Sequence, residues 1–302
     1  MLRRRLWMGS VFVVLGAIML AGKGIFAKQL YSLGVDFETV AATRSALAVP
    51  GFAIIAFLSG SFRREVRLKP LHAAAAIGAG LICYYLGSMA NFYALTLIDA
   101  SVERALLFTY PALVVLLSVI LGLEPVRRST LLALVTTFGG IALVVGIDSA
   151  EVLNANIEGA LWVFFCALTI AIYFLVSARL SPGMGSAMFT LLAMGAAGTA
   201  FSVHYELRHG WLNLSMSTEA WIWLGALILI ATIIPLSLMA EGVRRIGSQR
   251  AAFASTIGPP AAAVMAVVFL DEQITVFQLL GILVVVGSIV YLEVIARPGR
   301  SL

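Results

Sequence analysis

Charged residues are scarce in this chain, and their scarcity excludes most soluble proteins. Only 12% of the 302 residues are Asp, Glu, Lys or Arg, 61% are hydrophobic, and the mean hydropathy is +1.03. A soluble domain of this length carries about a quarter charged residues. The composition therefore predicts an integral membrane protein.

Catalytic and metal-binding signatures are also missing. The two cysteines, Cys83 and Cys166, lie in apolar segments without metal-ligand spacing, and we expect them to pack as small apolar residues. The three histidines have no second histidine at i+4, and neither a GxxxxGK[ST] phosphate loop nor a GxSxG nucleophile elbow occurs. The short loops leave no room for a soluble catalytic domain. We therefore expect no enzyme, no bound metal, no cofactor and no direct use of ATP.

Long apolar runs dominate the chain instead. Each run spans about 17–25 residues, enough to cross a bilayer core of roughly 30 Å. β-barrel strands would be about ten residues long and alternate in polarity, so the runs predict an all-α bundle of ten transmembrane helices. We expect these near residues 6–29, 38–59, 70–97, 100–122, 129–147, 158–178, 185–204, 220–243, 248–269 and 275–295.

One stretch of the sequence is repeated within the chain. The segment 95–125 reappears 148 positions later as 243–273 without a gap. At this offset, three residues of the first half align with residues of the same type in the second half: Pro111 with Pro259, Glu124 with Glu272 and, further on, Gly139 with Gly287. Proline and glutamate are expensive in lipid-facing helices, so their shared register indicates a duplication. We predict a first five-helix repeat over 1–148 and a second over 149–302.

The placement of charge predicts how the repeats are oriented. If both termini are cytoplasmic, fifteen basic residues fall in inner segments and two, Lys28 and Arg208, in outer ones, a strong positive-inside bias. This placement explains the isoelectric point near 9.5 without a nucleic-acid partner. Because each repeat has five spans, an odd number, the second repeat enters the membrane from the opposite side and is inverted relative to the first. We therefore expect inverted repeats in a multi-pass protein of the plasma (inner) membrane, with both termini cytoplasmic.

These features together resemble the drug/metabolite transporter superfamily, and most closely its EamA branch. The features are ten spans in an inverted five-plus-five duplication, Pro and Glu thirteen residues apart in spans four and nine, and glycines in the spans that follow. Prokaryotic EamA members are mostly exporters of metabolites and amino acids, so the resemblance implies a transporter of that kind. The matching residues are architectural and do not identify a substrate.

Ionisable residues inside the spans are the first candidates for a binding site, because each costs about 2.5–3.5 kcal/mol at a helix centre. Four lie in the outer half of the first repeat: Lys23, Arg44, Glu103 and Arg104. In one interpretation they face a wet cavity, with Glu103 paired to one cation and another cation free for a carboxylate or phosphate. In the other, the cations snorkel to the interface and Glu103 complements a helix N-terminus.

Helix breakers and aromatic residues complete the predicted pathway. The breakers are expected to flex spans one, four and nine: Gly22, Gly24, Pro111, Gly258, Pro259 and Pro260. Polar and aromatic side chains are expected to line the cavity: Tyr84, Asn91, Tyr110, Trp162, Tyr173, Ser255 and Thr256. Ordinary helix packing is the alternative for each of them. Glu124 and Glu272 end their spans and are interpreted as structural or gating residues.

The sequence thus predicts a secondary transporter that exports small metabolites such as amino acids by alternating access. A proton or solute gradient is the expected driving force, and the protein is expected to act as a monomer or a homodimer. Nucleotide-sugar, organic-anion or drug transport is the alternative within transporters, and a channel is the alternative class. The small multidrug members of the superfamily carry a glutamate in their first helix, whereas span one here offers Lys23 and no carboxylate, which disfavours a cationic drug.

Overall fold

The computed structural model describes residues 2–58, 69–123, 128–147, 149–210, 214–246 and 254–291, and within these ranges every regular element is a helix. Seven helices are long and apolar enough to cross a membrane: Trp7–Ser32, Phe37–Leu58, Pro70–Leu97, Ala100–Ile120, Ala150–Leu180, Ala187–Arg208 and Thr218–Met239. Three shorter apolar helices join them: Leu131–Val145, Gly258–Leu270 and Val276–Val290. The predicted all-α membrane fold with ten spans is confirmed.

Several spans are divided by a break or a wide turn. The first five spans are α1 (Leu2–Ala21) with α2 (Lys23–Ser32); α3 (Phe37–Leu58); α4 (Pro70–Gly80), the π-helix η1 (Leu81–Gly87) and α5 (Ser88–Leu97); α6 (Ala100–Leu107) with α7 (Tyr110–Ile120); and α8 (Arg128–Val145). The second five are α9 (Ala150–Met184); α10 (Ser186–Arg208); α11 (Thr218–Ile228), the π-helix η3 (Leu229–Ile233) and α12 (Ile234–Ile246); α14 (Gly258–Leu270); and α15 (Val276–Val290).

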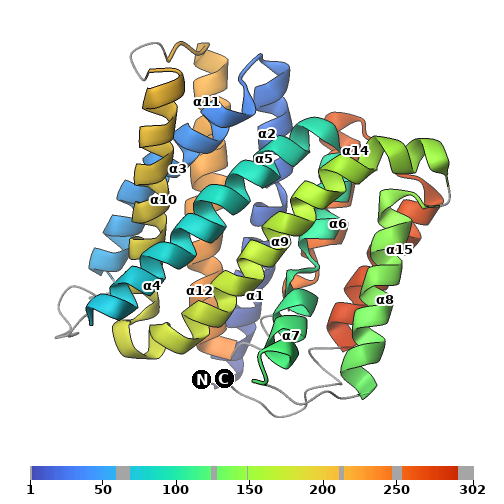
Figure 1. Ribbon diagram of the computed structural model, residues 1–302, viewed down its shortest axis with the longest axis horizontal. Helices are drawn as coiled ribbons and strands as arrows, with labels where there is room; N and C mark the ends of the chain where they lie inside the picture. Colours follow the sequence, from blue (N-terminus) through green and yellow to red (C-terminus); the bar gives the residue numbers. More distant parts are fainter. Residues whose placement is uncertain are drawn as a thin grey trace.

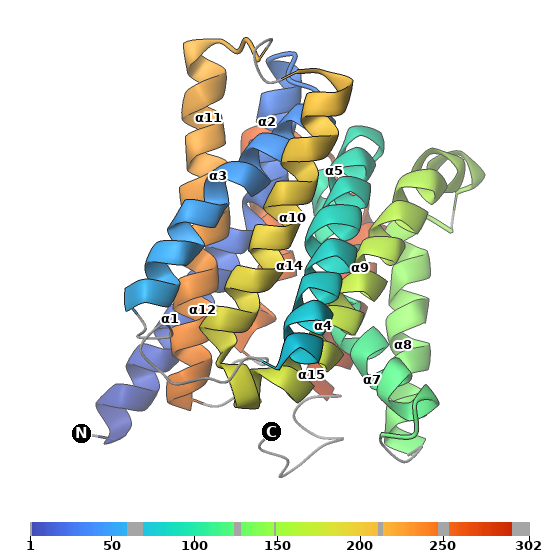
Figure 2. The same ribbon diagram turned by 60° about the vertical axis from the view of Figure 1, so that its left-hand side comes forward.

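The secondary structure repeats at the same offset as the sequence. Elements of the second half begin 148 positions after their counterparts, in four pairs: Pro70 and Thr218, Leu81 and Leu229, Tyr110 and Gly258, Arg128 and Val276. Even the π-helical turn occurs in both halves at this offset. The corresponding spans run in opposite directions, since the α4–α5 span rises in Figures 1 and 2 while the α11–α12 span descends. The chain is therefore built from two inverted five-helix repeats.

The two repeats pack through corresponding spans. Helix α3 lies against α10, α6 against α14, and α8 against α15, so three spans contact their own counterparts. Spans one and eight pack on each other through α1 and α12, and their counterparts, spans six and three, pack on each other through α9, η1 and α5. Figure 1 shows α8 and α15 side by side at one edge of the bundle, where the two helices pack on each other. This arrangement places an approximate twofold axis through the interface of the halves.

A direct backbone contact holds α8 against α15. A Cβ added to Gly281 would lie 2.7 Å from the Gly140 carbonyl oxygen and 2.8 Å from the Val144 nitrogen. A Cβ on Gly140 would in turn lie 3.0 Å from the Val285 nitrogen. Only glycine fits at such distances, so the two spans approach more closely here than side chains would allow.

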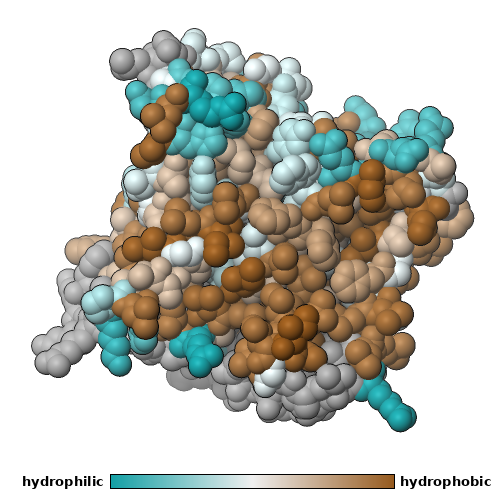
Figure 3. Space-filling model, in the orientation of Figure 1, coloured by the Kyte–Doolittle hydropathy of each residue, from teal (hydrophilic) through white to brown (hydrophobic). Residues whose placement is uncertain are grey.

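Polar residues gather at the two ends of the bundle. Figure 3 shows hydrophobic residues over the broad middle of this face and hydrophilic ones toward its upper and lower margins. We call the end that holds the α5–α6 connection the Asp99 end, and the end where α4 begins the Lys69 end. Helix α1 starts at the Lys69 end (Figure 1). An apolar belt between polar ends is the pattern a bilayer requires.

The helix boundaries differ most from the predicted spans at two places. Helix α9 begins at Ala150, eight positions before the predicted span, because its first turns are polar and exposed and hydropathy detects only the apolar part. Helix α14 begins at Gly258, and residues 248–253 of the predicted ninth span lie outside the described ranges, as does Glu124.

Candidate functional site

Three polar side chains from three helices meet inside the first half of the bundle. The Lys23 ammonium lies 3.2 Å from Glu103 Oε1 and also donates a hydrogen bond to Asn91 Oδ1. The Asn91 amide donates to the same Glu103 oxygen at 2.6 Å. The Glu103 side chain is 1% exposed and that of Lys23 13%. The triad of Lys23, Asn91 and Glu103 is therefore a buried, mutually satisfied network.

Local backbone structure places the triad at the junction of α2, α5 and α6. Lys23 starts α2 directly after a break at Gly22, whose N–H bonds to the Met19 carbonyl in a tighter turn. Gly24 lets α6 approach, because a Cβ there would lie 3.0 Å from that of Ala100. The predicted weakening of the span beside Lys23 thus coincides with an actual helix break. Glu103 lies in the first turn of α6, where the helix dipole favours a negative charge.

Arg44 lies beside the triad without joining it. Its Nη2 donates to the Ser88 hydroxyl at 3.2 Å, and its guanidinium carbon lies 5.1 Å from the centre of the Phe92 ring. The Lys23 ammonium lies 5.7 Å from the same ring, so both cations contact Phe92. Arg44 is 7% exposed, and its Nε is buried with no hydrogen-bond partner in the described ranges.

Arg104 points toward the other half of the protein. It follows Glu103 on α6, but its guanidinium lies against the first residue of α14, where a Cβ on Gly258 would be 3.2 Å from Nη2. Arg104 is 8% exposed, and its Nε is also buried without a hydrogen-bond partner in the part of the chain that the structure describes. Glycine at position 258 is what leaves room for this guanidinium between the two halves.

The site carries excess positive charge. Lys23, Arg44 and Arg104 supply three cations, and Glu103 is the single carboxylate in contact with any of them among the described residues. Removing an ion from water costs several kcal/mol unless a partner compensates. Lys23 has such a partner. Among the described residues, Arg44 has the Ser88 hydroxyl and the Phe92 ring, and Arg104 has no carboxylate in contact.

The prolines divide spans four and nine at equivalent positions. Pro111 is the second residue of α7, after the chain leaves α6 at Leu107, and Pro259 is the second residue of α14. The Thr109 hydroxyl and N–H both bond to the Leu106 carbonyl in the first break. Pro260 continues the first turn of α14, and Ser255 and Thr256 precede it. Both breaks lie where α6 packs on α14.

The predicted aromatic residues lie in different places. Tyr84 and Tyr173 meet edge to face at 4.9 Å between η1 and α9, and Tyr110 stacks on Phe174 at 5.2 Å. Trp162 is 41% exposed and contacts Tyr93 on the outside of α9, so the structure does not bring it to the triad. The sequence analysis did not single out Phe92, Ser88 or Tyr31, whose hydroxyl bonds to the Phe92 carbonyl at 2.8 Å. A lone aromatic or serine in an apolar span gives no distinguishing signal.

A carboxylate from the second half bonds to the start of α6 at the Asp99 end. Glu272 accepts hydrogen bonds from the N–H groups of Ala100 and Ser101 at 2.7 and 3.1 Å, and from the Ser101 hydroxyl at 2.7 Å. It therefore caps α6 in place of Asp99, the N-cap residue, whose side chain lies 3.9 Å from the Lys28 ammonium. Asp271 adopts the left-handed conformation (φ 54°) just before it.

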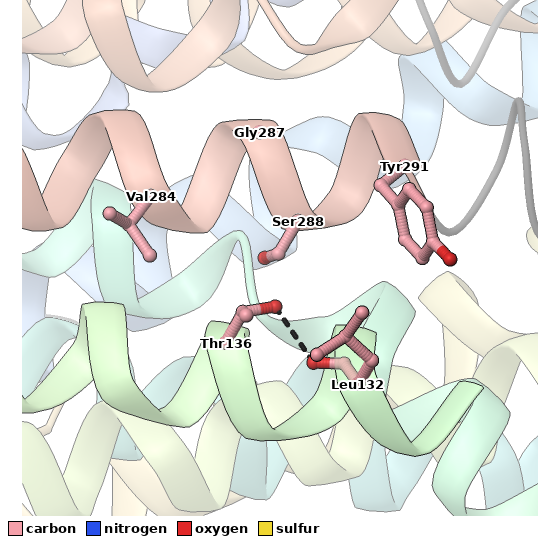
Figure 4. Close-up of a pocket in the computed structure, with 6 residues that line it drawn as sticks. All are labelled: Leu132, Thr136, Val284, Gly287, Ser288 and Tyr291. Atoms are coloured by element: carbon pink, nitrogen blue, oxygen red, sulfur yellow. Dashed lines mark hydrogen bonds between the residues drawn. The ribbon is translucent and has the colours of Figure 1, made fainter. Parts of the chain in front are cut away.

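A separate groove lies between α8 and α15. It has a volume of about 250 Å³ and is lined by Leu132, Thr136, Val284, Gly287, Ser288 and Tyr291. Figure 4 shows these side chains on the two helices, with the Thr136 hydroxyl bonded to the Leu132 carbonyl of its own helix at 2.9 Å. The groove contains no residue of the triad. Among the described residues, no three His, Cys, Asp or Glu side chains could hold a metal ion.

Comparison with known proteins identifies the family. The model of the EamA-like transporter family matches the chain twice, over residues 7–146 and 157–293. The chain belongs to the EamA-like transporter family. This is a family of membrane transporters and not of enzymes, and the two matches agree with the two repeats.

Two curated relatives and one solved structure agree with this membership. The chain is 30% identical over 277 residues to the uncharacterized transporter YcbK of Bacillus subtilis. The aligned region covers 90% of this chain and 88% of that protein. The chain is 25% identical over 274 residues to an uncharacterized transporter of Archaeoglobus fulgidus, covering 90% and 92% of the two chains. A crystal structure at 16% identity has a TM-score of 0.66 over 95% of this chain and 97% of that one, which supports the fold.

Proposed function

We propose that this EamA-like transporter is a secondary transporter that exports small metabolites such as amino acids by alternating access. The observation that carries the proposal is the direct packing of α3 on α10, α6 on α14 and α8 on α15. Because inverted repeats meet along corresponding spans, each half can adopt the conformation of the other, which exchanges the open and closed ends. The substrate then meets a site near the breaks of spans one, four and nine.

The proposed site is centred on the triad of Lys23, Asn91 and Glu103, with Arg44 and Arg104 on either side. Its buried ionisable residues support a binding role, since charges inside a membrane protein normally serve substrates or ions. The Glu272 cap on α6 supports a closed Asp99 end in this conformation. Transport would then require that cap to release and the Lys69 end to close.

Orientation is part of the proposal. We place the protein in the plasma membrane with both termini in the cytoplasm, so that the Lys69 end is cytoplasmic and the Asp99 end faces outward. The excess of basic residues in the inner loops supports this orientation. A proton or solute gradient is the proposed driving force.

Purified protein in proteoliposomes tests the function. Liposomes loaded with a labelled amino-acid mixture should release label faster than protein-free liposomes, with a rate that saturates with substrate concentration. Lys23→Ala should abolish that saturable component, and Arg128→Gln, which alters an exposed residue at the start of α8, should not. The proposal fails if no organic solute moves, and a conductance that rises without saturation would identify a channel.

A further inference from the structure

Two buried guanidinium groups in the site have no anionic partner among the residues that the structure describes. Arg44 and Arg104 are 7% and 8% exposed, and in the described part of the chain no carboxylate lies within 4.0 Å of either. Their Nε atoms are enclosed and make no hydrogen bond to any described residue. Buried polar groups in folded proteins are almost always satisfied, and buried cations are almost always paired. An arginine held in this way is prepared for a partner that arrives from outside the chain.

The carboxylate of the site is already occupied. Glu103 receives the Lys23 ammonium and the Asn91 amide on one oxygen, and it is 1% exposed. Lys23 and Asn91 both bond to Glu103 Oε1, so a substrate amine would reach the carboxylate only beside the Lys23 ammonium, which repels it. The site therefore favours an anion over a cation.

We infer that the transported substrate is recognised through an oxyanion, a carboxylate or a phosphate ester, which binds the unpaired guanidinium of Arg104 beside Gly258, with Arg44 as the second source of positive charge. The inference rests on the proposed function and narrows its substrate class. It makes any amino group of the substrate dispensable.

The position of Arg104 favours it as the primary contact. Its guanidinium lies between α6 and the first residue of α14, at the junction of the two halves and beside both proline breaks. An anion bound there contacts a residue of one half while lying against the other. A planar guanidinium binds a carboxylate or phosphate through two parallel hydrogen bonds, which a lysine cannot reproduce.

Thermal unfolding of the purified protein with charge-matched probes tests the inference. The probes are N-acetyl amino acids (net negative), the parent amino acids (zwitterionic) and the amino-acid amides (net positive), with sugar phosphates and inorganic phosphate as a separate arm. The acetylated and free acids should both raise the unfolding temperature, and the amides should not. Stabilisation by the phosphates alone would identify the oxyanion as a phosphate. Stabilisation by the amides, or by no anion of either arm, would overturn the inference.

Variants separate a binding role from a structural one. Arg104→Gln should weaken anion binding by more than about tenfold, and Arg104→Lys should restore it only in part. Without ligand, Arg104→Gln should unfold at a higher temperature than the wild type, because it removes an unpaired buried charge. A lower unfolding temperature together with unchanged anion binding would show that Arg104 is structural. Arg128→Gln, exposed at the start of α8, is the control for the loss of one positive charge.

Transport assays distinguish the two proposals. If amides or amines move across the membrane and acids do not, the protein is a transporter and the oxyanion inference is wrong. If no organic solute moves although anions still stabilise the protein, the binding site stands and the transport proposal fails.

Discussion

Glu272 and Ser101 belong to opposite repeats, and the Glu272 carboxylate accepts hydrogen bonds from both the Ser101 N–H at 3.1 Å and the Ser101 hydroxyl at 2.7 Å. A third bond, from the Ala100 N–H, completes the cap. The loop that follows span nine thereby holds the start of span four. It is a direct polar contact between the halves at the Asp99 end.

Loss of this cap should loosen the Asp99 end. Glu272→Ala removes three hydrogen bonds to a charged group and should lower the free energy of unfolding by about 1–3 kcal/mol. In a variant without the native cysteines, Ala105→Cys, which is buried one turn into α6, should react faster with a small thiol reagent when Glu272 is replaced. Glu219→Ala, exposed in the first turn of α11, should leave the labelling rate unchanged. Equal rates in all three backgrounds would exclude Glu272 as a gate.

The triad should behave as one energetic unit. Lys23→Met or Glu103→Gln alone leaves a buried group uncompensated and should destabilise the protein by about 3–5 kcal/mol. The double variant should be more stable than the sum of the single changes predicts, since neither charge then remains. A double-mutant cycle from thermal unfolding measures the difference. Simple additivity would mean that the 3.2 Å contact between Lys23 and Glu103 contributes nothing.

The contact between α8 and α15 should depend on Gly281 and not on Gly287. Gly281→Ala places a Cβ 2.7 Å from the Gly140 carbonyl oxygen, so the helices must separate, at a cost of about 1–3 kcal/mol. At Gly287, on the same helix, an added Cβ would have no atom of another described residue within 4 Å, so Gly287→Ala should be neutral or slightly stabilising. Unfolding temperatures of the two variants provide the comparison. Equal destabilisation would contradict the packing described for this pair.

Asp99 should make stability depend on pH. Partial burial, and then the nearby Glu272, raise the pKa of Asp99 above its ordinary value, against a smaller lowering by Lys28. The folded state therefore holds this proton to a higher pH than the unfolded state does. The resulting stabilisation is fully present below the ordinary aspartate pKa of about 3.9 and is lost as the pH rises through the raised value.

Asp99→Asn removes that dependence. The variant should unfold at a higher temperature than the wild type at neutral pH, and the difference should shrink as the pH falls toward 4. Unfolding curves of both proteins between about pH 4 and 8 supply the measurement. A difference that stays constant across this range would show that the Asp99 side chain does not act through its charge.

The proposed orientation makes a compartment-specific prediction. Arg128, at the start of α8, and Asp271, before α15, lie at opposite ends of the bundle (Figure 1). In intact cells, a cysteine at position 271 should react with an impermeant reagent, and a cysteine at position 128 should react only after the cells are opened. The reverse pattern would invert the proposed orientation while leaving the fold intact.

The fold was largely predictable because a bilayer makes length and hydropathy decisive. Ten apolar runs, and two prolines 148 positions apart, were enough to predict ten spans in inverted halves. The start of α9 could not be predicted in this way, because its polar first turns precede the apolar run. The residue types do not predict the two π-helical turns in spans three and eight, since Leu81 and Leu229 begin otherwise ordinary apolar segments.

The site was predictable in residue type and only partly in geometry. Lys23, Arg44, Glu103 and Arg104 were identified as costly charges, but their spacing does not reveal that Glu103 contacts Lys23 and that Arg104 faces Gly258. Those partners depend on how α2, α5, α6 and α14 cross. The binding roles of these residues, of the aromatic side chains and of the glycine and proline breaks stay predictions, as does the division of the chain at residue 148.

The wide turns η1 and η3 bear on the history of the protein. Each turn inserts extra backbone into a helix, and each begins at the same place in its own repeat, at Leu81 and at Leu229. Such an irregularity is difficult to acquire twice in one register, so a single ancestral five-helix chain already possessed it before the gene doubled. The present polypeptide therefore carries the same distorted helix twice, once in each direction across the bundle.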